Sequence, residues 1–206
     1  YAFSKITDAK KDKDGMYNLF GINYSQFVKG DVDFSKSYVL DSRNKIAFHV
    51  GVGVGYPYGN VKILPFERSY FSGGANSLRG WSVRTLGPGG MLADSVKSFA
   101  DQIGDIRLDL NLEYRTKMFW KFELAAYVDA GNIWNINRYE NRQGTKLSSG
   151  FYKQIAVGTG AGLRLDVNFF LLRFDLGLKL HDPMQAEGQR FVLLNRNGGF
   201  NKSVFN

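Results

Sequence analysis

Apolar and polar residues alternate with a period of two along most of the chain. In the segment 105–116, the even-numbered positions from Ile106 to Tyr114 are apolar or aromatic, and the odd-numbered positions from Arg107 to Arg115 are polar or charged. A period of two places successive side chains on opposite faces of a strand. No segment shows a convincing helical period. The same alternation predicts further strands over 28–40, 46–56, 122–131, 155–169 and 171–180.

The segment 16–27 follows this alternation less regularly. Its apolar residues change parity between Leu19 and Phe20, so we expect a strand that contains a β-bulge. Hydrophilic connections are expected at 8–15, 41–44, 135–150 and 182–190, and a long connection is expected at 57–104. The pattern therefore predicts an all-β chain of about six or seven antiparallel strands.

The predicted strands are long, and their apolar faces are nearly pure. Globular strands average about five or six residues, whereas strands of about ten residues are long enough to cross a membrane. Aromatic residues near strand ends would suit the girdle of a transmembrane β-barrel, namely Tyr56, Trp120, Trp134 and Phe169. The sequence contains no stretch of about eighteen apolar residues, so it predicts no transmembrane helix. The sequence thus favours a transmembrane β-barrel over a soluble β domain, whose strands are usually shorter.

Glycines gather on the polar faces of two predicted strands. They are Gly51, Gly53 and Gly55 on one strand, and Gly158, Gly160 and Gly162 on another. Glycine weakens a strand and often marks the close approach of another backbone. Two interpretations stay open: another segment lies against this face, or the glycines relieve crowding where the sheet bends.

Composition narrows the possible functions of the 206 residues. The chain has no cysteine, which excludes a disulfide scaffold, a thiolate zinc site and a cysteine nucleophile. It carries 27 basic and 19 acidic residues, for a net charge of +8, so nucleic acid is one conceivable partner. The basic residues are scattered rather than interleaved with one aromatic face, so we expect no nucleic-acid partner.

The sequence offers little for an enzyme. His49 and His181 are the two histidines of the chain, and no Gly-x-Ser-x-Gly motif accompanies them. The glycines at 158, 160 and 162 lack the later glycine and the helix that a dinucleotide site needs. We therefore expect no catalytic residue, no cofactor and no metal.

The segment 64–90 contains an ordered series of motifs. They are Pro65-Phe66, Phe71, Gly73-Gly74 and Leu78-Arg79-Gly80-Trp81. The series resembles the long loop of the outer-membrane BamA/TamA family, the bacterial surface antigen barrels, in which the last motif is Val-Arg-Gly followed by Phe or Tyr. Leu78 and Trp81 are conservative departures from that pattern. The segments 111–115, 127–134 and 160–164 resemble the strands that follow the loop, so the resemblance covers nearly the whole chain.

The resemblance implies a specific contact between the loop and the barrel. In that family the loop folds back into the barrel lumen, and its arginine contacts the aspartate of an aromatic-x-Asp-x-Gly strand. This implies an ion pair between Arg79 and Asp129, with Tyr127 alongside, Glu113 within reach and Gly131 in the same region. The alternation agrees, because Tyr127 and Asp129 share the polar face of their strand. The alternative is that Arg79 is an ordinary surface arginine.

The same contact yields an expectation for two substitutions. Breaking one partner of a pair that is shielded from water leaves the other partner uncompensated. We therefore expect Arg79→Ala to harm barrel assembly or function more than Arg84→Ala does. Pro65, Phe66, Gly73 and Gly74 are expected to support the loop.

The resemblance also implies parts that this chain does not show. Barrels of the family have about sixteen strands, and periplasmic POTRA domains receive their clients. We expect residues 1–206 to be the C-terminal portion of the barrel domain, with 57–104 as the lumen loop and with the POTRA domains and the final strand absent. Such a fragment would leave strand edges unpaired, so we expect it to self-associate through them when isolated.

The function implied by the resemblance is the assembly of other proteins in the bacterial outer membrane. Client strands would be added at a lateral seam of the barrel, without covalent chemistry. The implied partners are outer-membrane lipid, client outer-membrane or secreted proteins, and the POTRA domains. Two alternatives stay open: export of a secreted partner by a member of the same family, and a soluble basic β-sheet that acts as a binding module.

Overall fold

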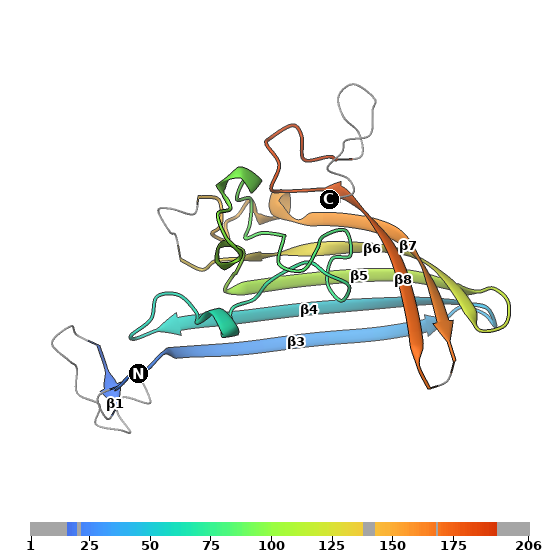
Figure 1. Ribbon diagram of the computed structural model, residues 1–206, viewed down its shortest axis with the longest axis horizontal. Helices are drawn as coiled ribbons and strands as arrows, with labels where there is room; N and C mark the ends of the chain where they lie inside the picture. Colours follow the sequence, from blue (N-terminus) through green and yellow to red (C-terminus); the bar gives the residue numbers. More distant parts are fainter. Residues whose placement is uncertain (1–15, 20–21, 138–142, 168, 193–206) are drawn as a thin grey trace.

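One curved antiparallel sheet of six strands dominates the computed structural model, which describes residues 16–19, 22–137, 143–167 and 169–192 (Figure 1). The strands lie in the sheet in sequence order, and each pairs with the next along the chain. They are β3 (Gln26–Val39), β4 (Asn44–Tyr58), β5 (Ile106–Lys117), β6 (Phe122–Trp134), β7 (Ala156–Asp166) and β8 (Leu171–His181). The predicted all-β, antiparallel fold is confirmed, and the sheet is not closed within the described residues.

The helices of the described residues are short. They are the 3-10 turns η1 (Phe66–Arg68), η2 (Ala93–Ser95), η3 (Phe99–Asp101) and η4 (Phe151–Gln154). The described part of the chain holds no helix with the length and apolar character needed to span a membrane.

The alternation predicted from the sequence sets the two faces of the sheet. On β4, for example, Val52, Val54 and Tyr56 are exposed, whereas Gly51 and Gly53 are buried on the opposite face. The buried face is covered by the long connection between β4 and β5, residues 59–105, which lies within the curve of the sheet (Figure 1). The apolar side chains therefore line the outside of the sheet, and the polar side chains meet the connection.

The two ends of the sheet differ in the length of their connections. Short connections join β3 to β4, β5 to β6 and β7 to β8 at one end of the sheet, and long connections join β4 to β5 and β6 to β7 at the other (Figure 1). This asymmetry is typical of outer-membrane β-barrels. The 11 residues of β7, at about 3.3 Å each and a tilt of about 40°, span about 28 Å of membrane thickness. A strand of this length is long enough to cross the apolar band of an outer membrane.

The loop explains some of the strand glycines. A Cβ on Gly53 would stand 2.5 Å from the Tyr70 ring, and a Cβ on Gly55 would stand 2.5 Å from Leu64. A Cβ on Gly158 would stand 3.2 Å from the Trp81 ring. At Gly51 and Gly162 the nearest atoms belong instead to side chains of the sheet. The interpretation that another segment lies against this face is therefore confirmed at Gly53, Gly55 and Gly158, whereas Gly51 and Gly162 leave room for side chains of the sheet.

The single strand expected over 16–27 is wrong. Two short strands, β1 (Asn18–Leu19) and β2 (Ile22–Asn23), pair with each other, and β3 begins at Gln26. The antiparallel pairing of Asn18 with Asn23 and of Leu19 with Ile22 takes the place of the single bulged strand. The connection expected at 8–15 and the chain after 192 lie outside the described residues.

One residue expected in the aromatic girdle lies elsewhere. Tyr56, Trp120 and Phe169 are exposed, but Trp134 is 1% exposed and donates its indole N–H to Oε1 of Gln154, at 2.8 Å. The last four residues of β6 are all buried, because both long connections pack around this end of the strand. Trp134 therefore belongs to the interior.

Candidate functional site

The segment 73–82 of the long loop forms a tight turn. Gly73 and Gly74 both have φ of +96°, a conformation that side-chain-bearing residues rarely adopt. The N–H of Gly74 donates to the carbonyl of Trp81 at 2.8 Å. A Cβ on Gly73 would collide with the carbonyl oxygen of Ser82. The two glycines thus fold the loop so that Leu78, Arg79, Gly80 and Trp81 stand at its tip.

Apolar side chains fix this tip in place. Leu78 and Trp81 are buried in a cluster with Leu86 of the loop, Ala156 of β7 and Met184. This packing anchors both ends of the four-residue motif. The side chain of Arg79, between them, is thereby held against the polar face of the sheet.

Arg79 binds two carboxylates on neighbouring strands. Its Nε and Nη2 donate to the two oxygens of Asp129 on β6, at 2.8 and 2.7 Å, and its main-chain N–H donates to Oδ2 at 3.1 Å. Its Nη1 donates to Oε2 of Glu113 on β5, at 2.5 Å. Asp129 is fully buried. A fork of this kind is the strongest geometry for an arginine and a carboxylate.

Two further side chains surround the guanidinium of Arg79 and its carboxylate partners. Together with Asp129 and Glu113, these side chains, Tyr127 and Asn111, form what we call the arginine pocket. The guanidinium carbon of Arg79 lies 3.3 Å from the ring centre of Tyr127, a cation–π arrangement. Asn111 donates from Nδ2 to Oδ1 of Asp129 at 2.9 Å and to the carbonyl of Ser77 at 2.7 Å. Asn111 therefore ties the loop backbone and the buried aspartate together.

The ion pairs continue across β7 and β8. Arg164 of β7 donates to Glu113 at 3.0 and 3.1 Å and to Oδ1 of Asp175 at 2.6 Å. Arg115 pairs with Glu113, and Arg173 pairs with Asp175 at 2.9 Å. The network therefore joins the loop to all four strands from β5 to β8.

The pKa of Arg79 reflects this surrounding. Burial alone would lower the pKa of its guanidinium, but the hydrogen bonds that Arg79 donates to Asp129 and Glu113 outweigh burial and hold the pKa above its ordinary value. Arg79 is therefore charged at every physiological pH. Desolvation offsets much of the attraction in such a network, yet removing one partner costs about 3–5 kcal/mol.

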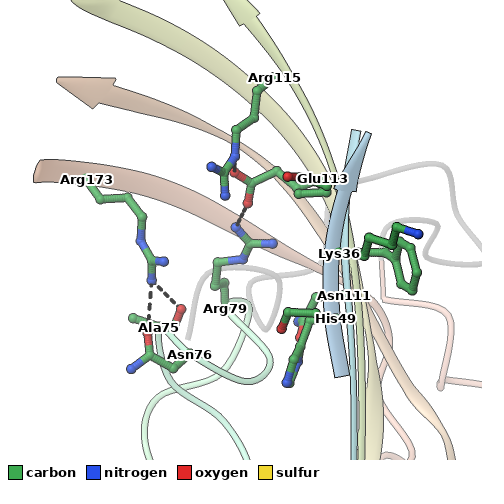
Figure 2. Close-up of a pocket in the computed structure, with 13 residues that line it drawn as sticks. Lys36, His49, Ala75, Asn76, Arg79, Asn111, Glu113, Arg115 and Arg173 are labelled. Atoms are coloured by element: carbon green, nitrogen blue, oxygen red, sulfur yellow. Dashed lines mark hydrogen bonds and ion pairs between the residues drawn. The ribbon is translucent and has the colours of Figure 1, made fainter. Parts of the chain in front are cut away.

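A cavity of about 460 Å³ lies beside the arginine pocket. Figure 2 shows Arg79 reaching toward Glu113 from one side, while Arg173 reaches the main chain of Ala75 and the side chain of Asn76. Arg173 thus holds the loop tip from β8 in addition to its pairing within the strand. Among the described residues, no group of three or more histidine and carboxylate side chains could hold a metal ion.

The other loop residues singled out in the sequence take different places. Pro65 precedes η1, and the ring of Phe66 lies 4.9 Å from the guanidinium of Arg84. Arg84 itself has φ of +60°, so it is not a neutral comparison for Arg79. A Cβ on Gly131 would meet the β5 backbone at Leu108, so the nearest neighbours of Gly131 belong to the sheet and not to the loop.

Sequence reasoning did not single out several members of the network. Asn111, Arg164, Arg173 and Asp175 alternate with apolar residues in the sequence, but no motif assigns them a contact. The signal available was their position: each stands on the polar face of its strand, within the stretch that the loop covers. Charged residues on a covered face need partners, so these residues were candidates for the network.

The long strands, the apolar outer face and the inward ion-pair network define a segment of a transmembrane β-barrel with a loop on its inner side. Residues 13–193 match the family described as the Omp85 superfamily domain. The chain belongs to this superfamily. Its members are outer-membrane proteins of Gram-negative bacteria, which confirms the location predicted from the sequence.

Comparison with individual proteins agrees with this assignment. The chain is 27% identical over 95 residues to the outer membrane protein assembly factor BamA of Neisseria meningitidis serogroup B, covering 44% of this chain and 12% of that protein. The crystal structure of BamA from Haemophilus ducreyi lacking POTRA domains 1–3 superposes with a TM-score of 0.60 and 21% identity, over 79% of this chain. That alignment covers 33% of the solved chain. The present chain thus spans a minor part of either relative.

Proposed function

We propose that this chain is the C-terminal portion of an outer-membrane barrel that assembles other outer-membrane proteins. The observation that carries the proposal is the docking of the loop. Arg79 is bound to Asp129 and Glu113 inside the curve of the sheet, and the chain belongs to the Omp85 superfamily. In this proposal the docked loop braces the barrel wall while client proteins are handled.

The mechanism we propose is strand addition. A client strand would pair with an exposed strand edge at a lateral seam, with main-chain hydrogen bonds supplying the affinity. The residues of this chain contribute no covalent step. POTRA domains on a preceding part of the protein would deliver the clients, and outer-membrane lipid would surround the apolar face. Export of a secreted partner uses the same parts, but the Neisseria relative bears the name of an assembly factor, which favours insertion.

The test compares two arginine substitutions in the protein that carries this chain, reconstituted in vesicles. Arg79→Ala removes the centre of the network, whereas Arg68→Ala removes an exposed arginine of the same loop. We expect Arg79→Ala to slow the folding of an added outer-membrane client, followed by the heat-dependent mobility of that client on gels. Arg68→Ala should leave the rate unchanged. Equal client folding by both variants would refute the role of the docked loop.

A second measurement separates the membrane barrel from a soluble binding module. The chain is refolded with and without detergent micelles, and its far-ultraviolet circular dichroism is compared. We expect β structure to form with micelles, because side chains such as Val32, Phe174 and Leu176 are exposed on the outer face. A monodisperse β-rich monomer in plain buffer would contradict the membrane assignment.

A further inference from the structure

A groove of about 760 Å³ opens on the outer face of the sheet, where β7 and β8 reach the long connections. Val157 of β7 alternates with Ala156 and Gly158, which are buried on the inner face, so Val157 faces outward. His181 is the Cα partner of Val157, and Phe191 forms the next antiparallel bridge to His181. The three side chains therefore share one outward wall.

The groove lies at the depth of a membrane surface. Val157 is the second residue of β7, and the 11 residues of that strand span about the thickness of the apolar band. Tyr152 and Phe191 are 61% and 72% exposed, and both line the groove. Exposed aromatic rings with a polar group nearby are typical of the membrane–water interface. The wall of the groove that Val157, His181 and Phe191 form is thus continuous with the lipid-facing surface.

The rim of the groove carries two basic groups. Lys153 and Arg190 line it, and within the described residues neither side chain makes an ion pair. The ammonium of Lys153 lies 5.9 Å from the ring centre of Tyr152, and Nε of Arg190 donates to the carbonyl of Gln185 at 3.4 Å. One carboxylate, Glu187, also lines the groove. The two cations outweigh it, so the rim is positive.

We propose that this groove binds an anionic lipid of the membrane in which the barrel stands. The phosphate of the headgroup would be held by Lys153 and Arg190, and the acyl chain would lie along Val157 and Phe191. A free phosphate would use the cations alone, and it would leave the apolar wall in contact with water. The combination of a positive rim and an apolar wall that continues into the lipid-facing surface fits a lipid. This site is separate from the docked loop and does not depend on the proposed function.

The experiment measures lipid binding to the protein that carries this chain, in neutral detergent micelles, by native mass spectrometry. Phosphatidylglycerol is compared with phosphatidylcholine of the same acyl chains and with inorganic phosphate. We expect phosphatidylglycerol to bind most tightly. Equal retention of phosphatidylcholine would overturn the charge argument. Equal binding of inorganic phosphate, shown by its competition at matched concentration, would overturn the assignment to a lipid.

Variants locate the binding on the groove. Lys153→Gln with Arg190→Gln should weaken phosphatidylglycerol binding by about tenfold or more, because charge-assisted hydrogen bonds to the phosphate are lost. Lys97→Gln with Lys146→Gln removes the same charge from exposed positions in the long connections outside the groove, and it should have no effect. Equal weakening by both pairs would overturn the site.

Two further variants test each half of the groove. Glu187→Gln removes the one opposing charge and should tighten phosphatidylglycerol binding. Val157→Ser should weaken the binding of the lipid but leave binding of soluble glycerol phosphate unchanged, because the acyl chain contact is lost. All these substitutions lie outside the arginine network, so client folding should be unaffected by them. If neither Glu187→Gln nor Val157→Ser changes the affinity for phosphatidylglycerol, the proposed position of the lipid in the groove is contradicted.

Discussion

Gly177 of β8 lies directly against the main chain of Arg79, because a Cβ on Gly177 would stand 2.5 Å from the Arg79 carbonyl oxygen. The same Cβ would stand 3.0 Å from the backbone nitrogen of Gly80. The loop tip can reach its docked position because Gly177 of β8 has no side chain. The ion pairs of Arg79 and the absence of a side chain at Gly177 are two parts of one docking surface.

Gly177→Ala should loosen the docked loop. The added methyl group must displace the backbone at Arg79, and overpacking of this kind costs about 1–3 kcal/mol. The free energy of unfolding, measured by urea titration in vesicles, should fall by that amount. Gly30→Ala is the control, because a Cβ there has nothing within 4 Å. A loss of stability that is the same at both positions would show that strand conformation, and not the loop contact, is responsible.

Arg79→Lys should lose most of what Arg79→Ala loses. A lysine carries one ammonium on a flexible stem and cannot reproduce the fork that bridges Asp129 and Glu113. Both substitutions should lower the free energy of unfolding by an amount near the 3–5 kcal/mol of a broken buried pair. Arg115→Lys is the control, because Arg115 is partly exposed and its one ion pair within the described part of the chain is with Glu113. Full rescue by Arg79→Lys would mean that charge suffices and that geometry is unimportant.

Asp105 should make the stability of the fold depend on pH. Burial raises the pKa of its carboxyl above the ordinary value of 3.8, so folding favours the protonated form. That stabilisation is present below the unfolded-state pKa and is lost as the pH rises through the folded-state pKa. Asp105→Asn should match the natural protein at acid pH and be more stable at neutral pH, because an amide oxygen can still accept from the N–H of Ile136.

Asp41, in the turn after β3, provides a control because the pKa of its carboxyl is shifted in the opposite direction. Hydrogen bonds from the Asn44 side chain and from the backbone N–H groups of Arg43 and Asn44 lower the pKa of its carboxyl. Its stabilisation is present above the unfolded-state pKa and disappears as the pH falls through the folded-state pKa. Asp41→Asn should therefore be less stable than the natural protein at neutral pH. Urea midpoints at two pH values measure both variants, and a common direction of change would contradict the assignment.

The three tryptophans should respond differently to lipid. Trp120, in the short connection after β5, is 74% exposed, whereas Trp81 and Trp134 are buried. In vesicles that contain brominated lipid, Trp120→Phe should remove most of the quenchable emission that this chain contributes. Trp81→Phe and Trp134→Phe should leave the amount of quenched emission unchanged, because they remove only emission that the lipid does not quench. Strong quenching of either buried residue would mean that the outward and inward faces are assigned incorrectly.

The strands were predictable from the sequence because one physical signal dominates them. Each strand separates lipid from the polar interior, so its alternation is sharp, and the predicted strand 105–116 differs from β5 (Ile106–Lys117) by one residue at each end. The signal fails where that separation ends. Both faces are covered around Trp134, and Leu19 and Ile22 belong to two short strands that pair with each other. At these places the polar or apolar character of a residue no longer predicts the face on which its side chain lies.

The site was predictable in part, for a different reason. The motif of the loop and the motif of β6 pointed to Arg79 and Asp129, which the structure places 2.7 Å apart. The partners Arg164 and Asp175 could not be paired from the sequence. Alternation gives the face on which a charge stands, but not which charges meet when a loop is inserted between them. That choice depends on the curvature of the sheet and on the path of the residues that cover it.

The sequence-ordered sheet also bears on how this barrel can change in evolution. Each strand of the six-stranded sheet pairs with its sequence neighbours in that sheet, so a hairpin is the natural unit of gain or loss. The strands from β5 to β8 cannot be lost in this way, because each supplies a charged group to the Arg79 network. Deleting a hairpin among them would leave buried charges without counterparts. Changes in strand number are therefore expected to begin at the side of β3 and β4.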